Sequence, residues 1–322
     1  MMASGEILTI GTAAQADIPA RGSRPPLSGF VWAALSVTIF SGWFVVTRFS
    51  VTRELRIWDI TALRFGIGAL LLAPVVLRRG SRLPIAAWKE GLVFALLWGV
   101  PFVLLVALGL RLTSAAEAAS VAPTLMPVFA GVFAWVFLRE PQGRLRWFGY
   151  AAIIAGLICL LLAATIVHGA PNPAGIGALA TAAAMWSVYT LLFRGSGLAP
   201  IQAAALICIW SAVFFIPAYL FLGLSRLALA SSGEIALQVV YQGVLMSGVA
   251  IVTFNRAVSQ LGPAAATAII ALLPGVAALL AIPVLGEIPS LPECLSIAVI
   301  VLGVLLASKP TPPLTTPPVP QT

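Results

Sequence analysis

The sequence predicts an all-α integral membrane protein whose ten transmembrane helices form two inverted five-helix repeats. Hydrophobic residues make up 61% of the 322 residues and charged residues only 9%, against roughly 25% charged residues in soluble proteins. Long apolar runs recur along the chain, and most basic residues lie in short clusters between them. A soluble chain this poor in charge could not cover its surface with polar groups. The composition therefore excludes a soluble enzyme, a disordered chain and a secreted disulfide scaffold.

Ten apolar runs are long enough to cross a bilayer. A helix needs about 20 apolar residues to cross about 30 Å of hydrocarbon. The runs that meet this length are 29–50, 59–77, 90–110, 117–138, 147–167, 174–193, 200–223, 235–256, 263–285 and 292–308. Each run is expected to form one crossing.

The basic residues indicate how these crossings are oriented, because Lys and Arg concentrate on the cytoplasmic side of a membrane. With ten crossings and a cytoplasmic N-terminus, the far side receives only Arg48, Arg53, Arg56, Arg111 and Arg226. Arg64 lies within the second run. The cytoplasmic side receives Arg21, Arg24, Arg78, Arg79, Arg82, Lys89, Arg139, Arg144, Arg146, Arg194, Arg256 and Lys309. This bias predicts a multi-pass protein of the cell inner membrane with both termini in the cytoplasm.

The predicted organisation has four parts. Residues 1–28 form a cytoplasmic tail, because this stretch lacks the long apolar segment of a signal peptide. Residues 29–167 form the first five-helix repeat and residues 174–308 the second. Residues 309–322 contain six prolines and are expected to form an extended cytoplasmic tail.

The chain offers little to a metal or a cofactor, and neither is expected. Cys159, Cys208 and Cys294 lie far apart, and His168 is the only histidine. A G-x-G-x-x-A match at 175–180 opens an apolar run with no soluble strand before it, so it does not indicate dinucleotide binding. The sequence has no G-x-x-x-x-G-K-[ST] motif, which argues against an ATP-driven pump. Basic clusters between apolar runs are orientation signals, so nucleic acid is not an expected partner.

An internal repeat relates the two halves. Four residue pairs recur at an offset of 147 residues: Pro127 and Pro274, Leu138 and Leu285, Glu140 and Glu287, Gly156 and Gly303. At a similar offset, Phe40-Ser41 aligns with Trp186-Ser187. Each predicted half has an odd number of helices, so the second half starts on the opposite side of the membrane. Such inverted repeats usually place a substrate site near the midplane, between halves that rock against each other.

Several stretches also carry a family resemblance. They are Ser41 to Arg48 (SGWFVVTR), Leu63-Arg64-Phe65, and the two Pro…Leu-x-Glu stretches 127–140 and 274–287. Together they resemble the drug/metabolite transporter superfamily, EamA type, over about residues 29–308. The resemblance implies ten helices, substrate movement without ATP hydrolysis and, commonly, export of amino acids or related metabolites. The second half lacks a counterpart of Arg64, so any role of this residue belongs to one half.

Arg64 is the main candidate for contact with a substrate. It lies about one turn into the second run, where a buried arginine costs at least ~2.5 kcal/mol unless water, a carbonyl or a counter-ion compensates. In one interpretation it anchors a substrate carboxylate in a central cavity. In the alternative it is a structural arginine that snorkels to the interface or pairs with the nearby Asp59.

Deep aromatic side chains are further candidates. Trp43, Trp98, Trp186, Tyr189 and Trp210 lie within predicted crossings and could line a cavity for aromatic or amphipathic solutes. Each could instead pack between helices or face lipid.

Three polar residues complete the candidates. Gln242 lies in the unusually polar eighth run and is expected to face the central cavity, because polar groups avoid lipid. Asn255, in the same run, is also expected to face inward, but closer to the interface than Gln242. Glu117 opens the fourth run and is a possible proton-coupling site, although a carboxylate also stabilises a helix N-terminus.

The combined prediction is a secondary transporter that exports small organic metabolites, such as amino acids or their derivatives, by alternating access between two halves. Its expected partners are a small-molecule substrate and the lipid bilayer, and both a monomer and a homodimer remain open. The alternatives are a membrane-embedded enzyme and a non-transporting scaffold. An enzyme would need convergent His, Asp, Glu or Cys side chains at one membrane face, which one histidine and scattered acids do not favour.

Overall fold

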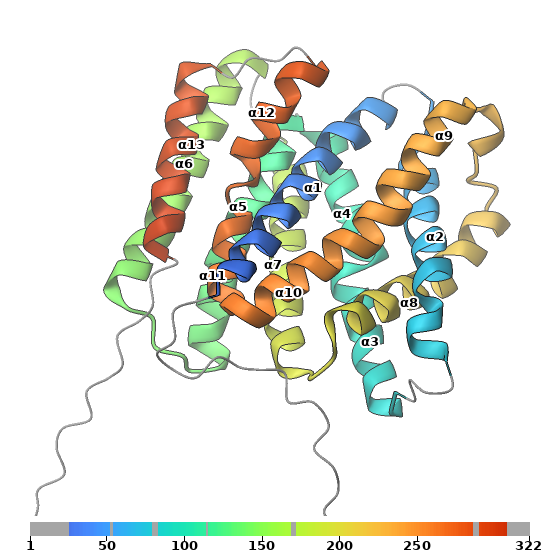
Figure 1. The fold of residues 1–322 in the computed structure, drawn as a ribbon. Coiled ribbons are helices and arrows are strands. Elements are labelled where there is room, and N and C mark those ends of the chain that lie inside the picture. Colours follow the sequence, from blue (N-terminus) through green and yellow to red (C-terminus); the bar gives the residue numbers. More distant parts are fainter. Residues whose placement is uncertain are drawn as a thin grey trace, which may run out of the picture.

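The computed structural model is a bundle of helices (Figure 1). It describes residues 26–51, 54–78, 83–113, 115–168, 172–285 and 290–307. The predicted tails lie outside the described residues, except that the first helix already begins at Leu27. The helix at the start and the helix at the end of the described chain have their terminal ends at the same end of the bundle, the lower one in Figure 1.

The helical elements follow one another along the chain with short connections. They are α1 (Leu27–Val51), α2 (Ile57–Leu77), α3 (Ile85–Trp98), α4 (Val100–Leu112), α5 (Ala115–Phe137), α6 (Arg144–His168), α7 (Pro173–Gly195), α8 (Pro200–Phe221), η2 (Leu227–Leu229), α9 (Ser232–Gln238), η3 (Val239–Ala250), α10 (Ile251–Leu261), α11 (Pro263–Ile270), α12 (Leu273–Leu285) and α13 (Leu291–Ala307).

Nine segments of the described chain are long and apolar enough to cross a bilayer. Three of them combine shorter elements: α3 with α4, α9 with η3 and α10, and α11 with α12. The apolar helix α13 has 17 residues and is shorter than the other nine. These segments lie where the ten apolar runs were predicted, which confirms a multi-pass helical membrane protein. The tenth crossing and the inverted orientation of the halves remain predictions.

Three of the crossing segments are irregular. α3 gives way to α4 at Gly99 (φ −96°, ψ −135°), where a side chain would collide with backbone of the preceding turn, and Pro101 lies in the first turn of α4. α11 and α12 are separated just before Pro274, whereas α5 continues through Pro127. η3 is a π-helix, a rare form that often accompanies functional sites.

Glycines bring the last segments of the two halves, α6 and α13, into close contact. A methyl group on Gly303 would lie 2.8 Å from both the Gly149 carbonyl oxygen and the Ile153 amide nitrogen. A methyl group on Gly156 would lie 2.7 Å from the Ile300 side chain. Small residues of this kind let helix backbones approach each other within a membrane.

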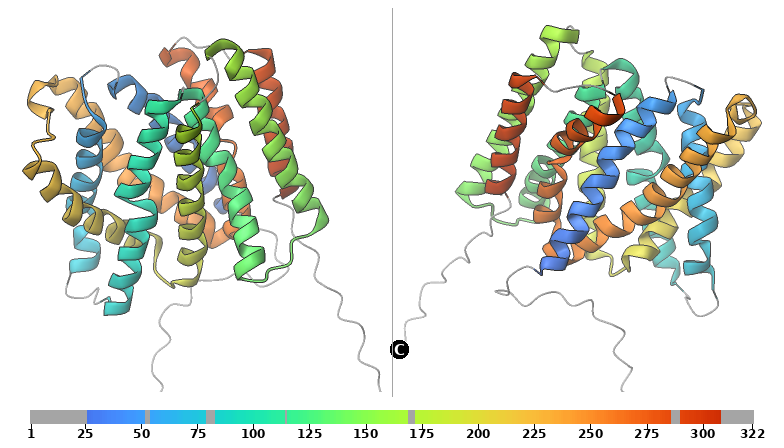
Figure 2. Two further views of the ribbon diagram at one scale, coloured as in Figure 1. Left: turned by 180° about the vertical axis from the view of Figure 1, so that it is seen from behind. Right: turned by 45° about the horizontal axis from the view of Figure 1, so that its top comes forward.

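Several contacts between the halves occur twice, with the roles of the first-half helix and the second-half helix interchanged. α5 packs on α7 as α12 packs on α1, and α4 packs on α7 as α10 packs on α1. The second segments, α2 and α8, pack on each other, as do α6 and α13. The two additional views in Figure 2 follow these helices from behind and from above. Two structurally related halves would produce this pattern.

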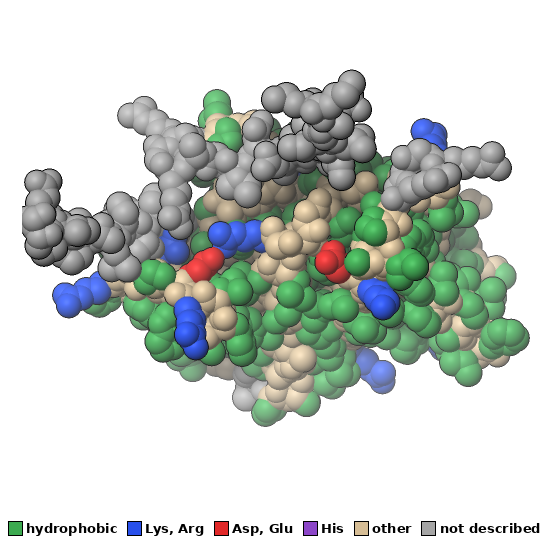
Figure 3. Space-filling view, turned by 90° about the horizontal axis from the view of Figure 1, so that it is seen from below, with side chains coloured by type: hydrophobic (Ala, Val, Ile, Leu, Met, Phe, Trp, Pro, Cys, Tyr) green, Lys and Arg blue, Asp and Glu red, His purple; other side chains and the backbone are tan. Residues whose placement is uncertain are grey.

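The outer surface is apolar along the helices and basic at one end. Leu70, Phe221 and Leu305 are 75%, 90% and 59% exposed, which suits contact with lipid. Seen from the end at which α1 begins, Lys and Arg side chains appear at several places and acidic side chains at fewer (Figure 3). Arg194 and Glu140 form an ion pair of 2.8 Å between the end of α7 and the α5–α6 connection.

Replacing Gly303 with Ala is expected to lower the Tm of the detergent-solubilised protein by several degrees. The added methyl group would overlap α6 backbone, and such overpacking costs about 1–3 kcal/mol. Gly177→Ala is the matched control, because nothing lies within 4 Å of a methyl group at that position of α7. Tm is measured by a thermal-unfolding assay on both variants. Equal Tm values would contradict the close α6–α13 contact.

Candidate functional site

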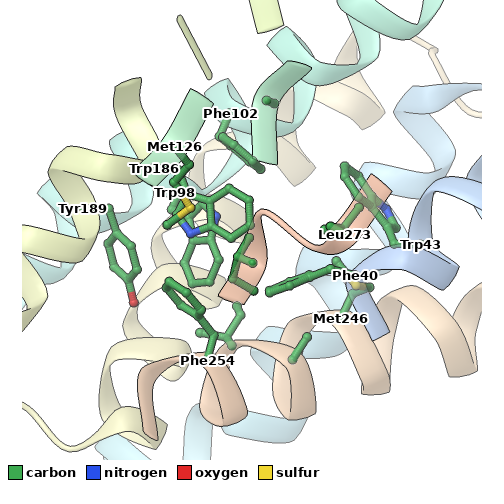
Figure 4. Close-up of a cluster of buried hydrophobic side chains, with 14 of the residues drawn as sticks. Phe40, Trp43, Trp98, Phe102, Met126, Trp186, Tyr189, Met246, Phe254 and Leu273 are labelled. Carbon is green, nitrogen blue, oxygen red and sulfur yellow. The ribbon is translucent and has the colours of Figure 1, made fainter. Parts of the chain in front are cut away.

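Aromatic side chains from both halves meet at the centre of the bundle (Figure 4). α1 provides Phe40 and Trp43, α3 provides Trp98, and α7 provides Trp186 and Tyr189. Each of these side chains is at most 4% exposed. The sequence singles out all but Phe40. Trp98 stacks on both Trp186 and Tyr189, whereas the Trp43 ring contacts Phe44 and shares only the cavity lining with Trp98 and Trp186.

The rings of this cluster are stacked. Trp98 lies nearly parallel to Trp186, with centroids 5.4 Å apart at 23°, and to Tyr189, with centroids 4.6 Å apart at 27°. Phe40 meets Trp186 edge to face at 5.4 Å and 79°. The Tyr189 hydroxyl donates a hydrogen bond of 2.8 Å to the Asn255 side-chain oxygen. These contacts fix the orientation of the rings, since each aromatic pair contributes about 0.5–1.5 kcal/mol beyond its buried area.

A small cavity lies beside the stacked rings. Its volume is about 10 Å³, which leaves room for about one water molecule. The lining residues are Phe40, Trp43, Phe44, Arg64, Trp98, Phe102, Val106, Ala122, Pro123, Trp186, Met246 and Leu273. A solute the size of an amino acid does not fit, so the structure represents a closed arrangement of the central site.

Two serines join the halves next to this cavity through matching hydrogen bonds. The Ser41 hydroxyl donates to the Leu273 carbonyl oxygen at 3.2 Å. The Ser187 hydroxyl lies 2.8 Å from the Met126 carbonyl oxygen and 2.7 Å from the Ala183 carbonyl oxygen of its own helix, and its one proton is shared between them. The Leu273 and Met126 carbonyls each belong to the residue that precedes a repeated proline. The sequence repeat therefore aligns the two serines with each other, and it also aligns the two residues that provide these carbonyls.

Arg64 lies at the edge of the cavity on α2 and is only 1% exposed. Its guanidinium carbon is 5.4 Å from the centroid of the Trp43 ring and 5.3 Å from that of Phe65. Both distances are within the range of cation–π attraction. Its Nε and Nη1 atoms have no hydrogen-bond partner among the described residues. A buried cation thus retains free donors beside the cavity.

Asp59 is not the partner of Arg64, which contradicts the predicted structural alternative. Its Oδ1 atom accepts from the Tyr219 hydroxyl at 2.6 Å and from the Arg226 amide at 2.9 Å. Its Oδ2 atom accepts from the Arg56 amide at 3.0 Å. Asp59 caps the start of α2 and ties it to the end of α8, so its acceptors are occupied. Burial at 1% exposure also contradicts snorkelling of Arg64.

The other candidates occupy different surroundings. Gln242 is fully buried in η3 and donates to the Thr47 hydroxyl at 3.1 Å, but it does not line the cavity. Trp210 lies apart from the central cluster and is half-buried, with its indole N–H donating to the Trp88 carbonyl at 3.0 Å. The structure therefore removes Trp210 from the cavity. The side chain of Glu117 lies outside the described residues.

Sequence reasoning missed several residues of the site. Phe40, Phe102, Met246 and Leu273 line the cavity, although nothing distinguishes their apolar side chains from those of neighbouring positions. Alignment of Phe40 with Trp186 in the repeat was the one available signal. Asn255 faces inward on α10, where it is fully buried and accepts the hydrogen bond of Tyr189.

A larger groove runs between α2 and α8, with a volume of about 930 Å³. Its lining is apolar apart from Arg78 at one end, and it includes the outward-facing Leu70 and Val213. A groove of exposed apolar side chains on the outer surface suits lipid chains better than a polar metabolite. The central cavity is therefore the better candidate for the substrate site despite its size.

The fold and the enclosed site define the class: a helical membrane protein whose two halves share a central cavity, as in membrane transporters. The sequence model of the EamA-like transporter family matches residues 27–162 and again residues 173–309, so the chain belongs to this family. This confirms the resemblance found in the sequence and identifies a membrane transporter of the drug/metabolite type. Members of the family are transporters rather than enzymes.

One solved structure, described only as "Crystal structure of protein", shares this fold. Its TM-score is 0.66 at 24% sequence identity, and the match covers 87% of this chain and 96% of that chain. At this identity the likeness concerns the fold alone. Comparison with curated proteins gave no match.

Ser41→Ala is expected to lower the stability of the folded protein by about 0.6 kcal/mol, because it removes one buried hydrogen bond between helices. Ser187→Ala is expected to have a smaller effect, because the Ser187 proton is shared between the Met126 carbonyl and the Ala183 carbonyl of its own helix. Thr38→Ala is the control, since the exposed Thr38 hydroxyl bonds only within its own helix. Unfolding midpoints in detergent measure the effect. If both serine variants matched the Thr38 variant, the bonds between the halves would carry no stability.

Proposed function

We propose that the protein is a secondary transporter of the inner membrane that exports small organic metabolites, such as amino acids or their derivatives. Transport proceeds by alternating access between two inverted halves, residues 29–167 and 174–308, with both termini in the cytoplasm. The basic bias of the sequence supports this orientation. The paired helix contacts and the paired serine bonds support a mechanism in which the halves move relative to each other.

The observation that carries the proposal is the free Arg64 guanidinium beside a central aromatic cavity. Its Nε and Nη1 donors lack partners in the described chain, and a substrate carboxylate would satisfy both. The adjacent Trp43, Trp98 and Trp186 rings would contact the apolar part of the same substrate. A zwitterionic or anionic metabolite with an apolar side chain therefore matches the site.

Transport requires the closed cavity to open, because a volume of about 10 Å³ holds about one water molecule. The breaks at Gly99 and before Pro274 directly adjoin the lining residues Trp98 and Leu273. Interrupted helices can bend at such positions without losing a full ladder of backbone hydrogen bonds. The two breaks would therefore let the lining residues separate when one half tilts.

The energy source in this proposal is the substrate gradient, by facilitated diffusion or exchange. The sequence lacks an ATP-binding motif, and its acidic residues are few and scattered. Proton exchange through Glu117 is the alternative that the experiments below distinguish.

Purified protein in proteoliposomes is expected to catalyse counterflow of labelled amino acids or related metabolites. Arg64→Ala is expected to reduce this counterflow about tenfold or more, because one charge-assisted hydrogen bond contributes about 1.5–3 kcal/mol. Arg64→Lys is expected to retain part of the activity, since lysine keeps the charge but loses the planar fork.

Arg256→Ala and Arg256→Lys are matched controls, because exposed Arg256 also lies over a tryptophan, Trp32, at 5.1 Å. Normal counterflow by Arg64→Ala would refute the anchor role, and no counterflow of any solute by folded protein would refute transport.

An imposed pH gradient is expected to leave substrate accumulation unchanged, in the parent protein and in Glu117→Gln alike. The physical reason is that exchange driven by the substrate gradient moves no proton. Uptake is measured in proteoliposomes with and without the gradient, and with an uncoupler. Accumulation that requires the gradient and disappears in Glu117→Gln would assign proton coupling to Glu117.

A further inference from the structure

Three polar side chains lie along one face of the segment formed by α9 and η3. Glu234, Gln238 and Gln242 follow at intervals of four residues and are 8%, 0% and 0% exposed. In each of them the Oε1 atom is buried and accepts no hydrogen bond from the described residues. Three unpartnered acceptors in a row are unusual for any buried surface, because each such group costs about 1–3 kcal/mol.

Helix α1 holds the two glutamines in place. Gln238 donates to the Ser50 hydroxyl at 2.5 Å, and Gln242 donates to the Thr47 hydroxyl at 3.1 Å. Ser50 and Thr47 are themselves fully or almost fully buried. Each amide nitrogen therefore donates one hydrogen bond to α1, whereas the amide oxygens accept none from the described residues.

Ser247 joins η3 to α2, the helix that carries Arg64. The Ser247 hydroxyl lies 2.5 Å from the main-chain carbonyl oxygen of Arg64 and 2.8 Å from the main-chain carbonyl oxygen of Gln242. Thr47, the partner of Gln242, lies one helical turn from Trp43, over which the Arg64 guanidinium lies. The residues with free acceptors and the residue with free donors therefore belong to segments that pack on each other.

The outer end of the row lies at the start of α9. The Ser231 hydroxyl caps this helix by accepting from the Glu234 amide at 3.4 Å. α9 lies at the end of the bundle opposite the one at which α1 begins (Figure 1). The row therefore extends from that end of the bundle toward the depth of Arg64.

We propose that Glu234, Gln238 and Gln242 line a file of water molecules that connects this end of the bundle to Arg64. Water both donates and accepts, so one file satisfies the free oxygens of the row and the free N–H groups of Arg64. The file hydrates the buried cation of Arg64. Because it presents a carboxylate and amide oxygens, it favours small cations over anions. The inference rests on burial and hydrogen bonding and does not require the proposed transport activity.

Cysteine accessibility in proteoliposomes tests the file. In a background with Cys159, Cys208 and Cys294 replaced by Ala, Gln238→Cys and Gln242→Cys are compared with Val240→Cys and Val244→Cys. The two valines lie on the same segment but face outward, at 55% and 39% exposed.

A water-soluble cationic methanethiosulfonate is expected to label positions 238 and 242 about tenfold faster than 240 and 244, since the thiolate forms only where water reaches it. Ser232→Cys, at the exposed start of α9, is the positive control. Labelling at 238 and 242 no faster than at 240 and 244 would overturn the proposal.

Two further variants examine the lining. Gln238→Leu is expected to slow labelling of Gln242→Cys about tenfold without changing labelling of Ser232→Cys, because an apolar side chain interrupts the file. Glu234→Gln is expected to reduce the preference at position 242 for the cationic reagent over an anionic sulfonate analogue. If Gln238→Leu left the labelling rate at position 242 unchanged, the path past Gln238 would be refuted. If Glu234→Gln left the reagent preference unchanged, the position of Glu234 at the outer end of the file would be refuted. All labelling is done without substrate on variants with an unaltered Tm, so a failure of transport and a failure of the file are distinguishable.

Discussion

Inside a bilayer the chain itself must supply the hydrogen-bond partner of nearly every buried polar group, and this constraint organises the structure. Asp59 uses both carboxylate oxygens to tie α2 to the end of α8. Ser41 and Ser187 each donate to a carbonyl of the other half. Tyr189 and Asn255 satisfy each other between α7 and α10. Each bond removes a desolvation cost and at the same time fixes which helix faces meet.

Some buried polar groups have no partner among the described residues, and they include single atoms of Trp43, Thr124, Trp186 and Ser211 on four different helices. The free donors of Arg64 and the free acceptors of Glu234, Gln238 and Gln242 lie along α2 and the α9–η3 segment. Proteins leave buried polar groups without protein partners mainly at functional sites, where a ligand or a water molecule completes the hydrogen bonding. In this member of the EamA-like transporter family, Arg64 borders the central aromatic cavity.

Much of the fold could be predicted because crossing a membrane depends on composition and length. The apolar runs, the basic clusters and the family resemblance required no knowledge of helix packing. The burial of Trp43, Trp98, Trp186 and Tyr189 could also be predicted, because they are large side chains deep in crossings, and three of them stack. Their role in a substrate site stays a prediction. Orientation was harder to predict: Trp210 lies in an equally apolar run but turns away to Trp88.

The sequence by itself determined which segments enter the membrane and that the halves repeat, because hydropathy and spacing are properties of the chain. The tertiary structure alone decided that Arg64 is free of Asp59, that the central cavity is closed, and that three acceptors of the α9–η3 segment lack partners. These facts depend on the rotation of each helix about its axis. In so apolar a chain, hydrophobicity differs little from one face of a helix to the other, so rotation is set by close packing and by single hydrogen bonds.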